Sequence, residues 1–280
     1  MYRIKPNVIF DFYGTLVDIH TDEEKLSLWN AMRDYYRAYG ADYTAEKLKN
    51  SYHAAVERET ARLRKKNREG NVEIDLGRVF VRLLKDAPHF HETQMSVHGI
   101  NRAAIQESDL QMLAHSDWAY STANLFRLLS REVFAPYEDT LPVLEALKQQ
   151  GCTLYILSNA QALFTRSEIE MSGVWPYMKK IYLSSDYQIR KPDPSFMQVL
   201  LKENDLKAED CIMIGNDISS DIAIAHACHM DSVFLNTFAW NNARIQEEIQ
   251  KNHLEQYCFG YIQDGRMKHL MEGDYICLNG

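Results

Sequence analysis

Five short apolar runs are separated by segments with helical spacing, and each run ends at small or polar residues. The first run spans residues 8–10 and leads directly into Asp11, and the other four span residues 153–157, 180–183, 211–214 and 232–235. A short apolar run bounded by turn residues is typical of a strand that is buried on both faces of a parallel sheet. Strands that alternate with helices predict an α/β fold with a doubly wound parallel sheet.

Residues 18–133, by contrast, show apolar positions at helical spacing and no strand pattern. Helices are expected near residues 26–40, 48–63, 75–86, 101–115 and 117–130. Thr21 and Glu24 match a capping box, which predicts a helix start at this point. An insertion this long is not a crossover connection. The sequence therefore predicts an all-helical domain of residues 18–133, inserted into an α/β core domain of residues 1–17 and 134–280. In the tail, residues 238–280, only one helix is predicted, at residues 241–251.

Length and composition narrow the class of protein. The 280 residues are 46% apolar and 25% charged, which is typical of soluble globular proteins. The formal charge of −8 and the lack of a basic face argue against nucleic-acid binding. No run of about 18 apolar residues is present, so no membrane span is expected. The short segment before the first strand leaves no room for a signal peptide.

The cysteines do not suggest a disulfide framework. The five are scattered along the chain, and Cys152 and Cys211 flank apolar strands. Free buried thiols are therefore expected rather than a disulfide or a zinc site. This pattern predicts a cytoplasmic protein. The oligomeric state is not predicted.

Two polar clusters lie in the helical insertion. His89, His91 and His98 have no adjacent cysteine or carboxylate and fit no familiar metal-ligand spacing, so no metal site is expected there. A basic cluster follows the second helix. It either binds an anionic substrate or forms a solvated helix end whose charge complements the helix macrodipole, and the second interpretation is favoured. The cluster consists of Arg62, Arg64, Lys65, Lys66 and Arg68.

Polar side chains follow several of the predicted strands. Because open α/β sheets bind ligands beyond the carboxyl ends of their strands, these side chains are expected in one crevice. They are Asp11, Thr15, Ser158, Asn159, Asp217 and Asp221, and Lys191 precedes a helix that starts near the same edge. Taken alone, Asp11 fits four alternative roles: a nucleophile, a metal ligand, a general base or a cap for the following turn. With Asp217 nearby, the two carboxylates would repel unless a cation lay between them. Oxygen ligands of this kind suit Mg²⁺, and a lysine, a hydroxyl and an amide suit a phosphoryl or carboxylate substrate.

In these motifs the sequence resembles the haloacid dehalogenase-like hydrolase superfamily, whose core is Rossmann-like. The resemblance rests on Asp11-Phe12-Tyr13-Gly14-Thr15, Ser158-Asn159, Lys191-Pro192 and Gly215-Asn216-Asp217 through Asp221, and it spans about residues 7–237. It implies that the helical insertion is a cap domain.

The resemblance also implies roles for individual residues. Asp11 would be the nucleophile and would form a covalent aspartyl intermediate. Thr15 or Ser158 would hydrogen-bond a substrate oxygen, with Asn159 beside it, and Lys191 would neutralise Asp11 and the transferred group. Asp217 would bind Mg²⁺ together with Asp11 and the backbone carbonyl of Tyr13. Asp221 would hold Lys191 or a metal-bound water.

Tyr13 departs from the phosphatase pattern. The phosphatases of this superfamily carry an acid–base aspartate two residues after the nucleophile, and a phenol titrates near pH 10, too high for a base at neutral pH. The motif D-x-Y-G-T looks like that of the 2-haloacid dehalogenases, in which a halide leaves without a proton, so that a tyrosine is acceptable at this position. The resemblance to those enzymes implies that no metal is used. Those enzymes also use an arginine from the cap, for which Arg33 and Arg37 are candidates.

The carboxylate pair Asp217 and Asp221 favours the phosphatase, since a bare carboxylate near Asp11 is costly without a cation. The leading hypothesis is a magnesium-dependent phosphatase acting on a small phosphorylated metabolite. The alternative is a metal-independent 2-haloacid dehalogenase. A third reading, suggested by Tyr13, is a weakly catalytic binding or regulatory protein on a hydrolase scaffold. In every case the partner is a small anionic molecule, without nucleic acid or membrane.

Overall fold

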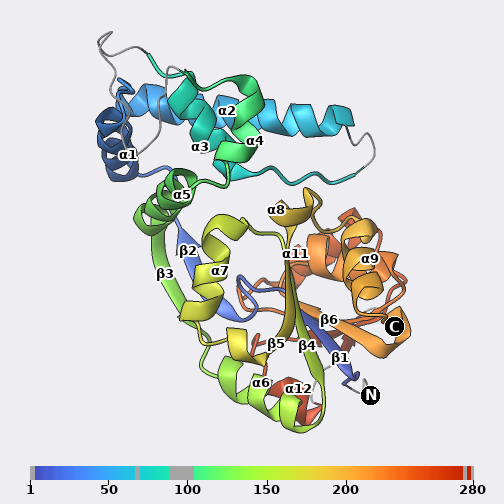
Figure 1. Cartoon of the computed structure of the whole chain (residues 1–280). Helices are drawn as coiled ribbons and strands as arrows, with labels where there is room; N and C mark the ends of the chain where they lie inside the picture. Colours follow the sequence, from blue (N-terminus) through green and yellow to red (C-terminus); the bar gives the residue numbers. More distant parts are fainter. Residues whose placement is uncertain (1–3, 67–69, 89–103, 274–275, 279–280) are drawn as a thin grey trace. The chain divides into compact units, whose positions relative to one another are not determined.

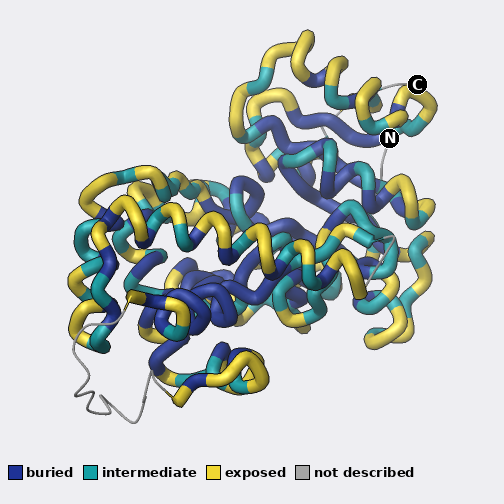
Figure 2. The backbone as a smooth tube through the Cα atoms, turned by 90° about the horizontal axis from the view of Figure 1, so that it is seen from above, coloured by how far each residue is buried: buried dark blue, intermediate teal, exposed yellow. Residues whose placement is uncertain are grey.

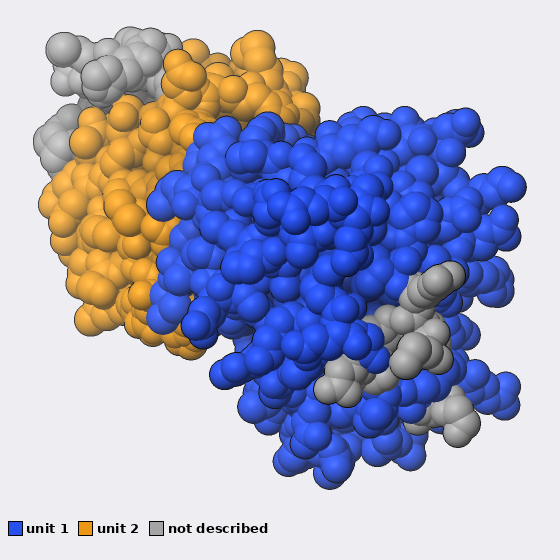
Figure 3. Space-filling model, turned by 90° about the horizontal axis from the view of Figure 1, so that it is seen from below, with its two compact units in different colours: residues 1–19, 133–162, 166–280 blue, residues 20–132, 163–165 orange. Residues whose placement is uncertain are grey.

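The computed structural model describes residues 4–66, 70–88, 104–273 and 276–278. The chain divides into two compact units, which Figure 3 shows in blue and orange. The first, here called the core unit, comprises residues 1–19, 133–162 and 166–280. The second, the helical unit, comprises residues 20–132 and 163–165. That the helical unit acts as a substrate-selecting cap stays a prediction.

The core unit is built on a seven-stranded sheet of order β5-β4-β1-β6-β7-β8-β9. All neighbours pair in parallel except β8 and β9, which are antiparallel. The five predicted strands are confirmed as β1 (Asn7–Phe10), β4 (Thr153–Ser158), β5 (Met178–Leu183), β6 (Cys211–Gly215) and β7 (Asp231–Leu235). The tail adds β8 (Phe259–Ile262) and β9 (Ile276–Leu278), which were not predicted. The doubly wound α/β fold class is therefore confirmed.

Both faces of this sheet are covered by helices (Figure 1). Val8 and Phe10 of β1 lie in one buried cluster with Leu144 of α6, whereas Ile9 lies in another with Phe196 of α9. Successive side chains of a strand point to opposite faces, so an uninterrupted apolar run is what a sheet covered on both sides requires. The helices of this unit are α6 (Thr140–Gln149), α7 (Ala162–Met171), α8 (Ser184–Tyr187), α9 (Pro194–Glu203), α10 (Ala223–Ala227), α11 (Asn242–Lys251) and α12 (His269–Glu272). β1, β4, β6, β7 and β8 are buried along almost their whole length, and Figure 2 draws buried stretches of the chain in dark blue.

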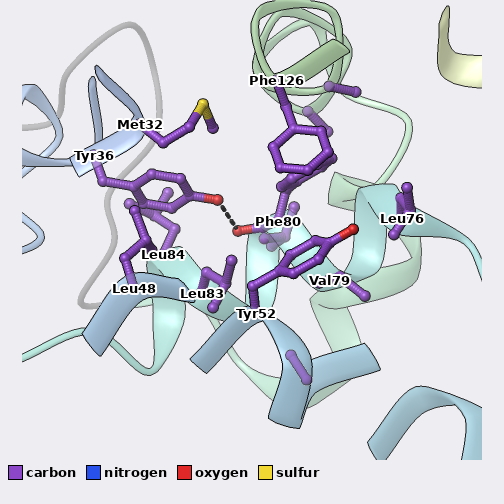
Figure 4. Close-up of a cluster of buried hydrophobic side chains, with 14 of the residues drawn as sticks. Met32, Tyr36, Leu48, Tyr52, Leu76, Val79, Phe80, Leu83, Leu84 and Phe126 are labelled. Atoms are coloured by element: carbon purple, nitrogen blue, oxygen red, sulfur yellow. Dashed lines mark hydrogen bonds between the residues drawn. The ribbon is translucent and has the colours of Figure 1, made fainter. Parts of the chain in front are cut away.

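The helical unit has its own aromatic core. Figure 4 shows Tyr36, Tyr52, Phe80 and Phe126 packed together, with the Tyr36 hydroxyl donating to the Phe80 carbonyl at 2.9 Å. That bond satisfies a buried hydroxyl, which an apolar core requires. The helices are α1 (Leu26–Ala38), α2 (Ala45–Lys66), α3 (Leu76–Lys85), α4 (Leu110–Leu113) and α5 (Asp117–Ser130). Of the predicted basic cluster, Arg64, Lys65 and Lys66 are exposed in the last turn of α2.

The ends of the predicted helical insertion differ from expectation. β2 (Val17–Thr21) and β3 (Arg131–Pro136) form a two-stranded sheet. Burial alternates along β2, which is the period of a strand with one solvated face. Thr21 therefore ends a strand, and the predicted capping box is wrong, because α1 has Lys25 at its N-cap without a side-chain cap.

The helix predicted at residues 101–115 is also wrong for the most part. Within residues 104–115 the structure has a 3₁₀ turn at Glu107–Asp109 and the four-residue α4. His89, His91, His98 and Arg68 lie outside the described residues.

One cysteine expectation is corrected by the tail. Cys258 and Cys277 form a disulfide, because the antiparallel pairing of β8 with β9 brings their segments together. Cys152, Cys211 and Cys228 are free, as expected. Among the described residues, no helix has both the length and the apolar character that crossing a membrane requires.

Candidate active site

The carboxyl ends of three adjacent parallel strands position the site. β1 lies between β4 and β6, with Phe10 level with Ile156 on one side and Ile214 on the other. Beyond the last pair, the Asp11 amide donates to the Ile214 carbonyl at 2.9 Å. Side chains that follow these strands therefore meet at one edge of the sheet, as the sequence predicted.

One oxygen of Asp11 is held by two donors. Its Oδ1 accepts hydrogen bonds from the Ser158 hydroxyl at 2.8 Å and from the Lys191 ammonium at 2.7 Å. No bond between Oδ2 and another described residue is found. The carboxylate is 7% exposed and lines a pocket. Asp11 is thus oriented through Oδ1, while Oδ2 is the oxygen left to react or to bind a cation.

Lys191 is fixed from both its backbone and its side chain. The Asn159 amide accepts from the Lys191 backbone N–H at 2.8 Å and donates to the Lys191 carbonyl at 3.1 Å. The ammonium donates to Asp221 Oδ1 at 2.6 Å and to the Leu157 carbonyl at 2.8 Å, in addition to Asp11. Asn159, predicted as a site residue, therefore holds the backbone of Lys191 in position.

The buried charges at this edge are not balanced. Lys191 and Asp221 are 2% and 1% exposed. Burial alone would lower the pKa of Lys191, but Asp11 and Asp221 outweigh it and the pKa lies above its ordinary value. Burial raises the pKa of Asp221 to about 7, and Asp11 and Asp217 add to the rise against the lowering effect of Lys191. A single ammonium thus serves several carboxylates, so the cluster favours a further positive charge.

Asp217 approaches the same pocket from the turn after β6. Its Oδ1 accepts from the Ser219 amide at 2.8 Å and from the Ser219 hydroxyl at 2.7 Å, and its own amide donates to Asp221 Oδ2 at 3.0 Å. Gly215 makes this turn possible, because a Cβ at that residue would lie 2.2 Å from Asp221 Oδ2. As for Asp11, no bond from Asp217 Oδ2 to another described residue is found.

Tyr13 and Thr15 have partners that sequence reasoning missed. The Tyr13 hydroxyl donates to the carboxylate of Glu168 on α7, which is 2% exposed. The Thr15 hydroxyl donates to Asn216 Oδ1 at 3.2 Å. Tyr13 and Asn216 line the pocket, but Thr15 is buried and does not. Of the two hydroxyl residues proposed to bond the substrate, only Ser158 therefore faces the pocket.

The pocket has a volume of about 380 Å³, within the range of small-molecule sites. Its lining includes the predicted motif residues. It also includes residues that were not predicted, namely Arg190, Phe238, Trp240, Arg244 and Glu248. For Phe238, Trp240, Arg244 and Glu248 the sequence contains one usable signal. Residues that follow β7 must lie at the same carboxyl edge of the sheet as Asp11.

The residues present fit a magnesium ion. Asp11 and Asp217 line one pocket, and each has one oxygen bonded within the protein and one that is not. In the described part of the chain, no group of three or more histidine, cysteine or acidic side chains is arranged to hold a metal. Magnesium does not require one, because it takes one or two carboxylates and fills the remaining positions with waters and substrate oxygens.

Comparison with known proteins agrees with the fold. The family model described as haloacid dehalogenase-like hydrolase matches residues 6–229. A phosphoglycolate phosphatase of Colwellia psychrerythraea is 31% identical over 123 residues, which cover 44% of this chain and 52% of that protein. A ribulose-1,5-bisphosphate 5-phosphatase of Halopiger xanaduensis is 26% identical over 120 residues, covering 41% and 50%. The chain thus spans about half the length of these relatives.

A solved structure extends the likeness over nearly the whole chain. A 2-haloacid dehalogenase of Pseudomonas syringae pv. Tomato superposes with a TM-score of 0.55 at 20% identity, covering 96% of this chain and 99% of that one. At this identity the likeness concerns the fold.

Proposed function

The chain belongs to the haloacid dehalogenase-like hydrolase family, and from this premise we propose that it is a magnesium-dependent phosphatase of small phosphorylated metabolites. The observation that carries the proposal is the surplus of carboxylates at the pocket. Asp11 and Asp217 face it together, and the ammonium of Lys191 is already shared between Asp11 and Asp221. A divalent cation would neutralise the surplus and allow a phosphate dianion to enter, whereas without a cation an anionic substrate would be repelled by Asp217.

In the proposed reaction Asp11 is the nucleophile. The Asp11 carboxylate attacks phosphorus, and the bonds from Ser158 and Lys191 to its Oδ1 hold it in one orientation before the substrate arrives. The bond to the leaving oxygen breaks, and that oxygen takes a proton from water in the pocket. A second water then attacks the phosphorus of the aspartyl phosphate, which releases phosphate and restores the Asp11 carboxylate. Lys191 stabilises the negative charge of Asp11 and of the transferred group.

Asp11, Asp217 and the Tyr13 carbonyl are the groups proposed to hold Mg²⁺. When bound, the ion supplies positive charge to the phosphoryl oxygens. Asp221 serves a different purpose, because its bonds to Lys191 and to the Asp217 amide fix both of these groups. The phosphatase names of the two curated relatives support this reaction class.

A 2-haloacid dehalogenase is the second candidate, and Tyr13 is the observation that favours it. The hydroxyl of Tyr13 is bonded to the buried carboxylate of Glu168, so this phenol is not a simple replacement for an acid–base aspartate. A halide needs no proton on leaving, which makes a tyrosine acceptable at this position. The candidate cap arginines are both engaged within the helical unit, Arg33 with Asp34 and Arg37 with Asp42.

One assay separates the candidates. The purified protein is incubated with p-nitrophenyl phosphate or with 2-chloropropionate, each with Mg²⁺ or with EDTA. We expect phosphate release that EDTA abolishes and added Mg²⁺ restores, and no chloride release. Chloride release that EDTA leaves unchanged would replace the phosphatase by the dehalogenase. No turnover of either compound, with binding of an anionic metabolite, would make the protein a binding module on this scaffold.

A further inference from the structure

The unpredicted wall of the pocket is supplied by the tail. Phe238 and Trp240 belong to the connection between β7 and α11, and Arg244 and Glu248 belong to α11. They face the same pocket as the nucleophile, so they contact whatever part of a substrate extends away from the phosphoryl group.

This wall is held in place by specific contacts. The Asn236 side chain, 5% exposed, accepts from the Trp240 amide at 2.7 Å and donates to the Trp240 carbonyl at 2.9 Å. The Thr237 hydroxyl donates to the Gly14 carbonyl at 2.6 Å, which ties the connection to the loop that carries Asp11. The wall therefore has a fixed position relative to the nucleophile, as a specificity surface requires.

Gly14 shows how closely the two segments approach. Its φ is +78°, and a Cβ there would lie 2.9 Å from Phe238 Cζ and 2.2 Å from Asn216 Nδ2. A glycine is required on both grounds, because a side chain would displace the wall and is strained at positive φ.

Arg244 is the charged group that this wall presents. Its guanidinium lies 4.1 Å from the centre of the Trp240 ring, and the ring also packs against Phe234 at 5.8 Å. A guanidinium stacked on an indole is held by a cation–π contact while its N–H groups stay available. Because the guanidinium covers one face of the Trp240 ring, that face is not a platform for an aromatic ligand.

The arginines of the pocket have no acidic partner. Among the described residues, neither Arg190 nor Arg244 forms an ion pair, and both line the pocket. Glu248, the acidic residue of the wall, lies 3.8 Å from Lys251. Two guanidinium groups without an ion pair, in the same pocket as the nucleophile, suit an anionic ligand.

We propose that Arg244, stacked on Trp240, binds a second oxyanion of the substrate, with Arg190 assisting. The substrate class is then a small phosphomonoester that carries a carboxylate or another phosphate on its leaving group. This inference rests on the proposed phosphatase function and adds the substrate class. Arg244 is assigned to recognition of the substrate, so its loss raises KM more than it lowers kcat.

Matched substrate pairs test the proposal. 3-Phosphoglycerate and glycerol 3-phosphate differ by a carboxylate, and fructose 1,6-bisphosphate and fructose 6-phosphate differ by a phosphate. With Mg²⁺, the wild-type protein should prefer the member with the second oxyanion in at least one pair. In Arg244→Gln that preference, measured as the ratio of kcat/KM values, should fall roughly 10- to 100-fold, the loss expected for a hydrogen bond between charged groups. Arg244→Lys, which keeps the charge but not the planar fork, should lie in between.

Lys202→Gln is the control, because it removes a cation from the exposed face of α9 that does not line the pocket. It should leave the ratio unchanged. Wild-type turnover of p-nitrophenyl phosphate without preference in either pair, or an unaltered ratio in Arg244→Gln, overturns the inference and leaves the phosphatase standing. A preference for uridine 5′-monophosphate that Arg244→Gln does not alter also overturns it. Absence of phosphatase activity on every compound refutes the proposed function and the inference with it.

Discussion

Two buried clusters of charged side chains, one in each unit, use similar residue types with opposite charge balance. In the helical unit, Glu59 is 1% exposed and accepts from Arg62, Arg78 and Arg82 at 2.7, 2.9 and 2.8 Å. Burial alone would raise the pKa of Glu59, but the arginines outweigh it and lower the pKa to about 2. The charge of this carboxylate is compensated, and Arg82 pairs with Glu107 as well.

The core cluster has the reverse composition. Lys191 is the single ammonium between Asp11 and Asp221, and the pKa of Asp221 is raised to about 7 by burial and by its acidic neighbours. The cluster opens onto the pocket through Asp11. In the helical unit Arg82 lines a smaller pocket, but Glu59 lines neither of the two. A buried ion cluster whose charges are satisfied within the protein stabilises the fold, and one that leaves a charge unsatisfied is ready for a ligand.

The largest effect is expected from Asp11→Asn. The change removes the nucleophile, so turnover should fall on the order of 10⁴-fold or more. It also relieves the surplus of negative charge around Lys191, so the free energy of unfolding should change by less than about 1 kcal/mol. Phosphate release and urea unfolding measure the two effects. Retention of wild-type turnover would refute Asp11 as the nucleophile, and a large loss of stability would mean that the core cluster is structural.

Glu59→Gln should produce the opposite pattern. It leaves Arg62, Arg78 and Arg82 facing a neutral amide, and breaking a buried ion network typically costs about 3–5 kcal/mol. Because Trp29 and Trp118 belong to the helical unit, urea unfolding is followed by fluorescence in a background with Trp175→Phe and Trp240→Phe. Glu57→Gln, an exposed neighbour on α2, is the matched control. Equal stability of the two variants would remove the distinction between the clusters.

The sequence predicted the central strands because burial on both faces leaves an apolar run that local pattern reveals. It did not predict β2, in which Asp18 and His20 alternate with apolar residues. It placed Asp18 and His20 in the helical insertion instead. It also missed β9, which is three residues long and largely exposed, so that pairing with β8 decides its conformation.

The same limit applies to the site. Asp11, Ser158 and Asp217 were predicted together because each follows a strand, and strand ends in a parallel sheet share an edge. Glu168 lies within α7, and its contact with Tyr13 depends on how that helix packs against the loop after β1. Arg244 lies only four residues after Trp240, but its position at the pocket depends on how α11 packs. Tertiary packing of this kind leaves no trace in spacing along the chain. The roles of all these residues stay predictions.

The smallest effect expected is a pH dependence confined to the helical cluster. Because the pKa of Glu59 is lowered from 4.5 to about 2 in the folded protein, its ionised form contributes stability above pH 4.5, and that stability is lost as the pH falls toward 2. The maximal slope for one proton is about 1.4 kcal/mol per pH unit. The difference in unfolding free energy between the wild-type protein and Glu59→Gln should therefore narrow by about 1 kcal/mol per unit between pH 4.5 and pH 2 and stay constant between pH 5 and pH 7. Urea unfolding at half-unit intervals, with the same tryptophan background, measures this difference. A difference that is constant over the whole range would mean that the arginines do not hold the pKa of Glu59 below its ordinary value.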